Sequence, residues 1–217
     1  MNGKADRYTT VAITLHWVMA LGVLALAALG LVMVHGHLGL GRRFALYQLH
    51  KSIGVTILVA ALLRLAWRHA HRPPSLPTHM PQLERLSAHA GHRLLYFYLI
   101  ALPLTGWALV SASVLNIPTH LYGVIPWPHL RVLSSLHDKA PVEALLKSIH
   151  RYGAWALLVL VAGHAGAALR HHFVQKDDVL LRMLPRLHAD RSIATTPFLE
   201  RRAARISEAL SSAKTKV

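Results

Sequence analysis

Two histidines in the last long apolar segment have the spacing of residues that share one helix face. The segment from Ser148 to Arg170 reads SIHRYGAWALLVLVAGHAGAALR, and it carries His150 and His164 among Ala, Leu, Val and Gly residues. In an α-helix, their separation of fourteen residues makes almost four turns and a rise of about 21 Å, so both imidazoles point to the same side. In a hydrocarbon core about 30 Å thick, one imidazole would lie near each surface. The spacing therefore predicts two cofactor sites, one above the other.

The elements that must position these histidines are helices long enough to cross a membrane. Apolar segments predict four spans, at about 11–34, 49–67, 93–114 and 148–170. We expect 35–48 to be a Gly-rich loop, 81–92 a short amphipathic lead into the third span, and 115–147 an interfacial loop. Residues 1–187 then form one four-span domain, followed by a polar cytoplasmic C-terminal tail over 188–217. The predicted fold class is an all-α membrane protein, a four-helix transmembrane bundle.

Composition supports a membrane protein and removes several kinds of metal site. The chain has 217 residues, of which 53% are hydrophobic and 15% charged, whereas soluble domains carry about 25% charged residues. It has no cysteine, which excludes disulfides, thiolate metal ligands, iron–sulfur clusters and covalently attached c-type haem. It has 17 histidines and few acidic residues, which makes imidazole the leading candidate ligand.

The basic residues indicate an orientation in the membrane. The termini and the loop between the second and third spans hold 17 Lys and Arg residues, and the other two loops with their flanks hold 7. The positive-inside rule then places both termini in the cytoplasm. The same rule explains most of the formal charge of +15. A nucleic-acid-binding function is not needed to explain this charge, and no stretch interleaves basic and aromatic residues as single-strand binders do. Seven basic residues remain outside: Arg42, Arg43, Lys51, Arg131, Lys139, Lys147 and Arg151.

With this topology, four histidines fall into two pairs at matched depths. His16 and His164 lie near the inner face, and His50 and His150 open their spans near the outer face. Each pair combines the fourth span with one other span, as b-type haem requires when two imidazoles from facing helices bind one iron atom. Hydrogen bonds between helices are the alternative use of such histidines. Zinc or copper would favour three or four ligands at one level.

Arg64 and several glycines lie where they could serve these sites. Arg64 follows His50 by fourteen residues, which places it on the same face at the depth of the inner pair. A haem propionate is its expected partner, and snorkelling towards the surface is the alternative. Three of these histidines, His50, His150 and His164, have glycines nearby in the sequence, namely Gly54, Gly153, Gly163 and Gly166. They would let a flat macrocycle approach, although close helix packing needs the same residues.

Several motifs together resemble the bacterial cytochrome b561 family. They are LHW (15–17), LHKS (49–52), AHAGHRLLY (88–96), IHRYGAW (149–155), GHAGAALRHHF (163–173) and RMLP (182–185). The resemblance covers about residues 7 to 187. It implies a four-helix membrane protein with two b-type haems, held by His16 with His164 and by His50 with His150.

The resemblance also implies an activity and a location in the bacterial inner (cytoplasmic) membrane. Members act as superoxide oxidases, which take an electron from superoxide at the outer haem and reduce ubiquinone near the inner haem. His171 would belong to the quinone site, and His171 or His92 could supply the titratable group that quinone reduction needs. The outer basic residues, in particular Lys51, Lys147 and Arg151, would attract the superoxide anion. We expect no obligatory protein partner.

Two other functions remain open at this stage. The chain could be an anchor and electron-transfer subunit that relays electrons between quinone and a partner dehydrogenase or hydrogenase. Less favoured is a transporter of a non-haem metal or of protons that uses the same histidines.

Overall fold

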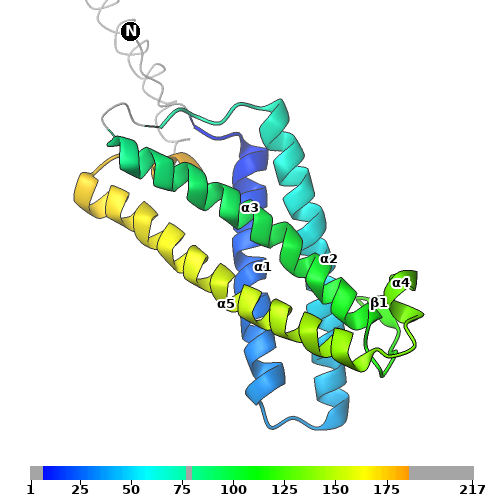
Figure 1. Ribbon diagram of the computed structural model, residues 1–217. Coiled ribbons are helices and arrows are strands. Elements are labelled where there is room, and N and C mark those ends of the chain that lie inside the picture. The colour runs from blue at the N-terminus through cyan, green and yellow to red at the C-terminus, as the bar shows by residue number, and fades with distance from the viewer. Residues whose placement is uncertain (1–6, 77–79, 186–217) are drawn as a thin grey trace, which may run out of the picture. The chain divides into compact units, whose positions relative to one another are not determined.

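The computed structural model describes residues 7–76 and 80–185, which form a bundle of long helices with a small hairpin at one end (Figure 1). The elements, in order, are helices α1 (Thr10–His35), α2 (Leu40–Ala70) and α3 (Gln82–Ser111), strands β1 (Thr119–Leu121) and β2 (Ile125–Trp127), the short helix α4 (Arg131–Ser134) and helix α5 (Ala140–Arg170). A π-helical turn (His171–Gln175) and a 3₁₀ turn (Leu181–Met183) follow α5. The predicted tail, 188–217, lies outside the described residues.

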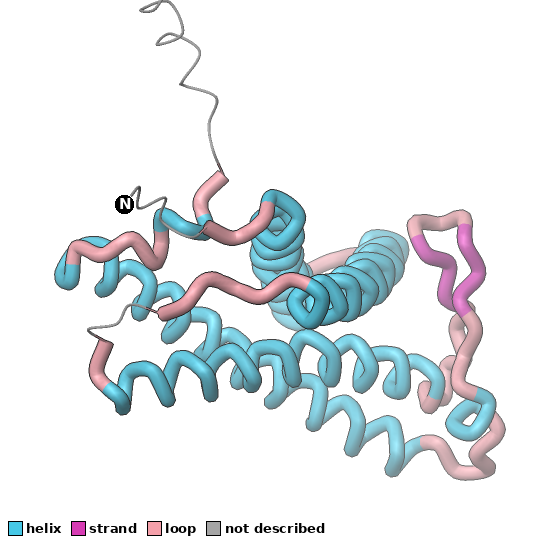
Figure 2. Tube along the Cα trace, turned by 90° about the horizontal axis from the view of Figure 1, so that it is seen from above, coloured by secondary structure: helices cyan, strands magenta, loops and turns pink. Residues whose placement is uncertain are grey.

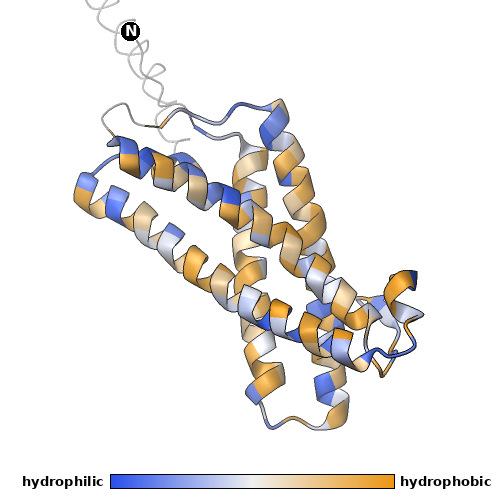
Figure 3. Ribbon diagram, in the orientation of Figure 1, coloured by the Kyte–Doolittle hydropathy of each residue, from blue (hydrophilic) through white to orange (hydrophobic). Residues whose placement is uncertain are grey.

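Four of the described helices are long and apolar enough to cross a membrane, which confirms the predicted all-α bundle. Much of their apolar surface is exposed, as at Leu21 (65%) and Val159 (71%). A water-soluble protein would bury such side chains, whereas lipid tails solvate them. Hydropathy colouring shows the same apolar surface along the helices, with polar residues gathered towards their ends (Figure 3).

The helices pack as two pairs, α1 beside α2 and α3 beside α5, with α2 also contacting α3 (Figures 1 and 2). Small residues allow the close approach. A Cβ atom at Gly22 of α1 would lie 2.5 Å from a side-chain carbon of Ile57 in α2. A Cβ atom at Gly153 of α5 would lie 2.8 Å from Leu102 in α3. Gly153 therefore serves helix packing, rather than the approach of a macrocycle that its sequence position also allowed.

Helix boundaries differ from the predicted spans. The predicted loop over 35–48 is wrong, because α2 begins at Leu40, directly after the N-cap residue Gly39. The amphipathic stretch over 81–92 continues without a break into α3, which ends at Ser111 rather than at 114. Helix α5 begins at Ala140, with Pro141 in its first turn. Apolar runs mark the hydrocarbon core, but helical hydrogen bonding continues beyond it wherever no residue breaks the helix.

The hairpin is fastened to α2, and its end of the bundle is called the hairpin end below. The Ser52 hydroxyl accepts a hydrogen bond from the Tyr122 backbone N–H at 2.8 Å, and Thr56 and Tyr122 share a hydrogen bond between their hydroxyls at 2.7 Å. At the other end, called the terminal end, the indole N–H of Trp17 donates to the Met183 carbonyl at 2.9 Å. Arg7 donates to the Leu184 carbonyl. These bonds hold the segment after α5 against the start of α1.

Candidate functional site

At the hairpin end, His50 of α2 and His150 of α5 face each other. Their ring centres lie 6.3 Å apart, with an angle of 72° between the rings. The Nδ1 atom of His150 lies 3.0 Å from the hydroxyl oxygen of Thr105 in α3. That hydroxyl donates its only proton to the Leu102 carbonyl at 2.8 Å, so it must accept from His150. The proton of His150 is thus on Nδ1, and the lone pair of Nε2 is free to bind a metal.

At the terminal end, His16 of α1 and His164 of α5, which the sequence predicts as the inner pair, face each other in the same way. Their ring centres lie 6.2 Å apart at 66°. A third histidine, His92 of α3, lies with its ring centre 5.5 Å from that of His164. His92 was predicted as a quinone residue, and the structure gives it a place beside the inner pair.

The distances within both pairs fit two imidazoles bound to opposite sides of one iron atom. A metal–nitrogen bond of about 2.0 Å, plus about 1.2 Å from that nitrogen to the ring centre, gives roughly 6.4 Å between ring centres. In the part of the chain that the structure describes, no hydrogen bond joins the two imidazoles of either pair. His150 does make a hydrogen bond between helices, to Thr105, which is the alternative use that the sequence left open. The described residues also form no group of three or more His or acidic side chains placed to hold a metal ion. Each pair therefore suits a prosthetic group whose metal ion would be held by two histidines from different helices.

Gly106 lies against a histidine of these pairs, and three of the glycines that the sequence places near the histidines face open space. A Cβ atom at Gly106 would lie 3.2 Å from Cε1 of His150, so glycine at this position allows the imidazole its orientation. A Cβ atom at Gly54, Gly163 or Gly166 would meet no atom within 4 Å, which suits the approach of a flat group to those helix faces. The Nδ1 atom of His50 is buried without a hydrogen-bond partner among the described residues.

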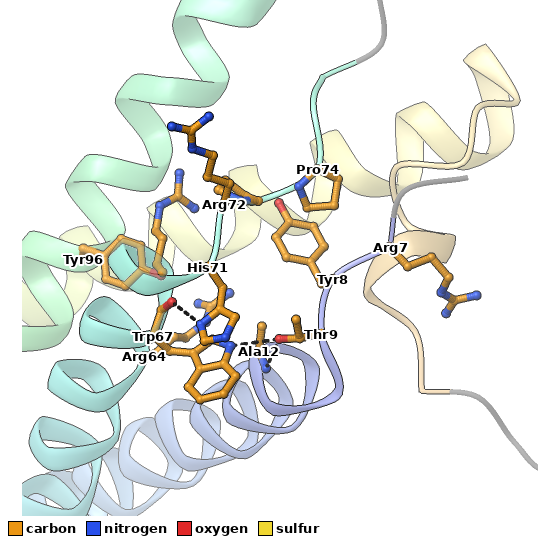
Figure 4. Close-up of a pocket in the computed structure, with 12 residues that line it drawn as sticks. Arg7, Tyr8, Thr9, Ala12, Arg64, Trp67, His71, Arg72, Pro74 and Tyr96 are labelled. Carbon is orange, nitrogen blue, oxygen red and sulfur yellow. Dashed lines mark hydrogen bonds between the residues drawn. The ribbon is translucent and has the colours of Figure 1, made fainter. Parts of the chain in front are cut away.

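Arg64 lies at the depth predicted for it. Its guanidinium carbon is 5.6 Å from the ring centre of Tyr96 in α3 (Figure 4), and its charge interacts electrostatically with His16 and His164. No carboxylate among the described residues pairs with it. A partly buried guanidinium in this position is suited to a carboxylate ligand, as the haem propionate hypothesis requires.

His171 is buried at the terminal end and lies between two acidic residues. Its Nδ1 atom is 2.6 Å from a carboxylate oxygen of Asp177, and its Nε2 atom is 3.4 Å from one of Glu84. Glu84 also accepts hydrogen bonds from Arg170 and Gln175. Because both ring nitrogens face carboxylates, this cluster can hold a proton and pass it between neighbouring groups.

The three residues predicted to attract an anion all lie at the hairpin end. Lys147 and Arg151 are exposed on α5. Lys51 is half-buried, and its amine donates to the Thr119 hydroxyl at 3.0 Å, so it is tied to the hairpin.

At the same end, the surroundings of His129 lower the pKa of its imidazole. Burial, then the charges of Lys51 and Lys139, lower the pKa of His129, with a backbone hydrogen bond to Ile117 opposing them. His129 lies in a pocket that Thr119 and Trp127 also line. A proton on His129 would thus add a third positive charge beside two lysines.

Sequence reasoning missed Thr105, Glu84 and Asp177 as parts of these sites. A single Thr in an apolar helix is a weak signal, because most bond only to their own backbone. Glu84 and Asp177 lie far apart in the sequence, and only the fold brings both to His171.

Comparison with known proteins agrees with this arrangement. The family model described as prokaryotic cytochrome b561 matches residues 7–186. "Cytochrome b561 homolog 2" of Escherichia coli (strain K12) is 33% identical over 87% of this chain and 96% of its own length. "Cytochrome b561 homolog 1" of the same strain is 32% identical over 83% and 98%. "Probable superoxide oxidase CybB" of Yersinia pestis is 31% identical over 83% and 97%. The chain therefore belongs to the prokaryotic cytochrome b561 family of b-type haem, electron-transferring bacterial membrane proteins.

Proposed function

We propose that this chain is a superoxide oxidase of the bacterial inner membrane, which oxidises superoxide to dioxygen and reduces ubiquinone. The observation that carries the proposal is the presence of two facing histidine pairs at opposite ends of α5. The similarity to the Yersinia pestis protein, whose name is "Probable superoxide oxidase CybB", supports the same activity.

The histidine pairs would hold two b-type haems, one by His16 with His164 and the other by His50 with His150. Bound haem supplies a centre that takes up and releases one electron at a time. The protein contributes the orientation of the ligands. Thr105 keeps His150 in the tautomer that leaves Nε2 free, and Arg64 offers a positive charge for a propionate.

The hairpin end suits an anionic substrate. Superoxide gives up one electron and leaves as dioxygen, so this end needs no general acid and no nucleophile. It needs a positive field that concentrates the anion, and Lys147 and Arg151 supply one from the exposed surface of α5. Lys51 adds its charge from the edge of the hairpin. We place this end on the outside, with both termini in the cytoplasm, because it carries fewer of the basic residues.

The terminal end suits the reduction of ubiquinone. Each ubiquinone takes up two electrons, from two superoxide anions, and two protons. His171 with Asp177 and Glu84 can hold protons there, and His92 is a second titratable group beside the inner pair. No partner protein is needed for this reaction.

The experiment that tests the proposal measures ubiquinone reduction by the purified, haem-loaded protein in detergent. Superoxide is generated enzymatically, and quinol formation is followed with and without superoxide dismutase. We expect quinol formation that depends on the chain and disappears when the dismutase removes superoxide. A haem-loaded protein that reduces no quinone with superoxide, but does so with a partner dehydrogenase, would instead identify a relay subunit.

A further inference from the structure

A pocket rich in arginine lies at the terminal end, between the start of α1, the end of α2 and α3 (Figure 4). Arg64, Arg68 and Arg72 line it at intervals of four residues along the end of α2 and the segment after it. His71 lines it as well, with its ring stacked 3.9 Å from that of Trp67. No acidic side chain is present among the described residues that line the pocket.

The arginines of the pocket lie close together, and no carboxylate of residues 7–76 or 80–185 forms an ion pair with them. The guanidinium groups of Arg64 and Arg68 both lie over the ring of Tyr96, at 5.6 and 5.9 Å from its centre. Their charges repel each other, and such repulsion is strong near a membrane because lipid and protein screen it poorly. In the described part of the chain, the acidic residues at this end have other partners, Glu84 with Arg170, Asp178 with Arg182 and Asp177 with His171. Within the described residues, the pocket therefore has a positive charge that no carboxylate balances, which suits a bound anion.

Three arginines of the pocket, Arg64, Arg68 and Arg72, lie at different distances from the inner histidine pair. Arg64 interacts with His16 and His164, so a propionate of the inner haem would neutralise it. Arg68 follows about 6 Å further along the helix axis, towards the end of the bundle, and Arg72 lies in the segment beyond the end of α2. A haem propionate on Arg64 would leave these two charges without a partner.

The level of Arg68 and Arg72 matches that of lipid headgroups. Tyr8 and Trp67 line the same pocket, and the indole N–H of Trp67 donates to the Thr9 hydroxyl at 2.9 Å (Figure 4). Trp and Tyr residues gather where the hydrocarbon core meets the headgroups. Arg7 also lines the pocket, but it points away from its centre and donates to the Leu184 carbonyl.

We propose that Arg68, Arg72 and His71 bind the phosphate group of an anionic phospholipid. Two guanidinium groups offer paired N–H donors that match phosphate oxygens. The Nδ1 atom of His71 donates to the Trp67 carbonyl at 3.2 Å, so this imidazole adds a third donor to the phosphate only when Nε2 is protonated as well. Basic pockets between membrane helices are known sites for anionic headgroups. A lipid fits better than free phosphate because the pocket opens at the end of membrane-spanning helices, where phospholipid is far more concentrated. The site does not depend on superoxide chemistry.

Native mass spectrometry of the purified, haem-loaded protein tests this site. Delipidated protein is titrated with phosphatidylglycerol, with zwitterionic phosphatidylcholine and, separately, with inorganic phosphate. The test variant is Arg68→Gln/Arg72→Gln. The matched control is Arg85→Gln/Arg93→Gln, which removes two exposed charges of α3 at the same end, outside the pocket. The single variant Arg72→Gln, at an exposed residue beyond α2, guards against loss of folding in the double variant.

We expect phosphatidylglycerol to bind the wild-type protein about tenfold more tightly than phosphatidylcholine. The test variants should lose most of this preference, while the control variant and the haem content remain unchanged. Equal weakening by the control would show a diffuse charge effect and overturn the proposal. Tight binding of inorganic phosphate, without a preference among the lipids, would also overturn the proposal. Loss of haem from Arg72→Gln would overturn it as well, because it would assign these arginines to haem propionates.

Discussion

Replacing Thr105 with Val tests whether this hydroxyl orients an axial histidine of the hairpin-end site. The Thr105 hydroxyl accepts from Nδ1 of His150 at 3.0 Å and donates to the Leu102 carbonyl at 2.8 Å. Valine has nearly the same shape but no hydroxyl, so the change removes the acceptor with little effect on packing. The imidazole N–H of His150, in the half-buried interface of α3 and α5, would then have only the Leu102 carbonyl as an acceptor.

The size of the effect follows from the energy of this hydrogen bond. A neutral hydrogen bond contributes about 0.5–1.5 kcal/mol. It also makes the imidazole more basic, which favours the ferric form of a bound haem iron. If the whole contribution were specific to the ferric form, its loss would raise the midpoint potential by at most about 65 mV, since a tenfold change corresponds to about 59 mV for one electron. The same energy corresponds to a fall in haem affinity at this site of roughly 2–13-fold.

The assay is a redox titration of purified protein, followed by the b-type α band, together with haem content per chain. We expect one of two haem components to shift upwards in Thr105→Val, or to be lost, while the other is unchanged. Thr105→Ser keeps a hydroxyl and should restore the wild-type potential. Full haem content with both potentials unchanged in Thr105→Val would refute the assignment of the tautomer and of the site.

Three further predictions follow from the two sites and the hairpin end. His164→Ala should remove the inner haem and leave about one haem per chain, as measured by pyridine haemochrome, and two retained haems would contradict the ligand set. Reversal of charge in Lys147→Glu/Arg151→Glu should lower the rate of quinone reduction with superoxide and weaken the dependence of that rate on salt. Arg93→Glu, at the other end, should leave both unchanged. Equal rates in all variants would contradict electrostatic attraction of superoxide by Lys147 and Arg151. Because the pKa of His129 is lowered, the folded hairpin favours its neutral form, and stability that is complete above the ordinary pKa of about 6.5 is lost as the pH falls through the lowered value. The protection factors of the hairpin amides, which are exchange rates corrected for the slower chemical exchange at low pH, should therefore fall on acidification in the wild type and much less in His129→Gln. Identical pH profiles of the protection factors would show that another group is responsible.

The amino-acid sequence by itself determined the membrane class, the four spans and the shared face of His150 and His164. These properties depend on local rules, namely the apolar length that crosses a bilayer and the helical repeat of 3.6 residues. The same rules did not predict where helices end. Leu40 and Ala140 begin helices well outside the apolar runs, because backbone hydrogen bonding continues beyond the hydrocarbon core.

Only the tertiary structure decided which side chains meet across helices. The pairing of His150 with Thr105 depends on how far α5 is shifted along α3, and Gly153 against Leu102 sets that register. The position of Glu84 beside His171 depends on the same packing of helices that lie far apart in the sequence. A shift of one residue turns a helical side chain by about 100°, so contacts of this kind arise from packing and cannot be read from hydropathy or from spacing within one helix.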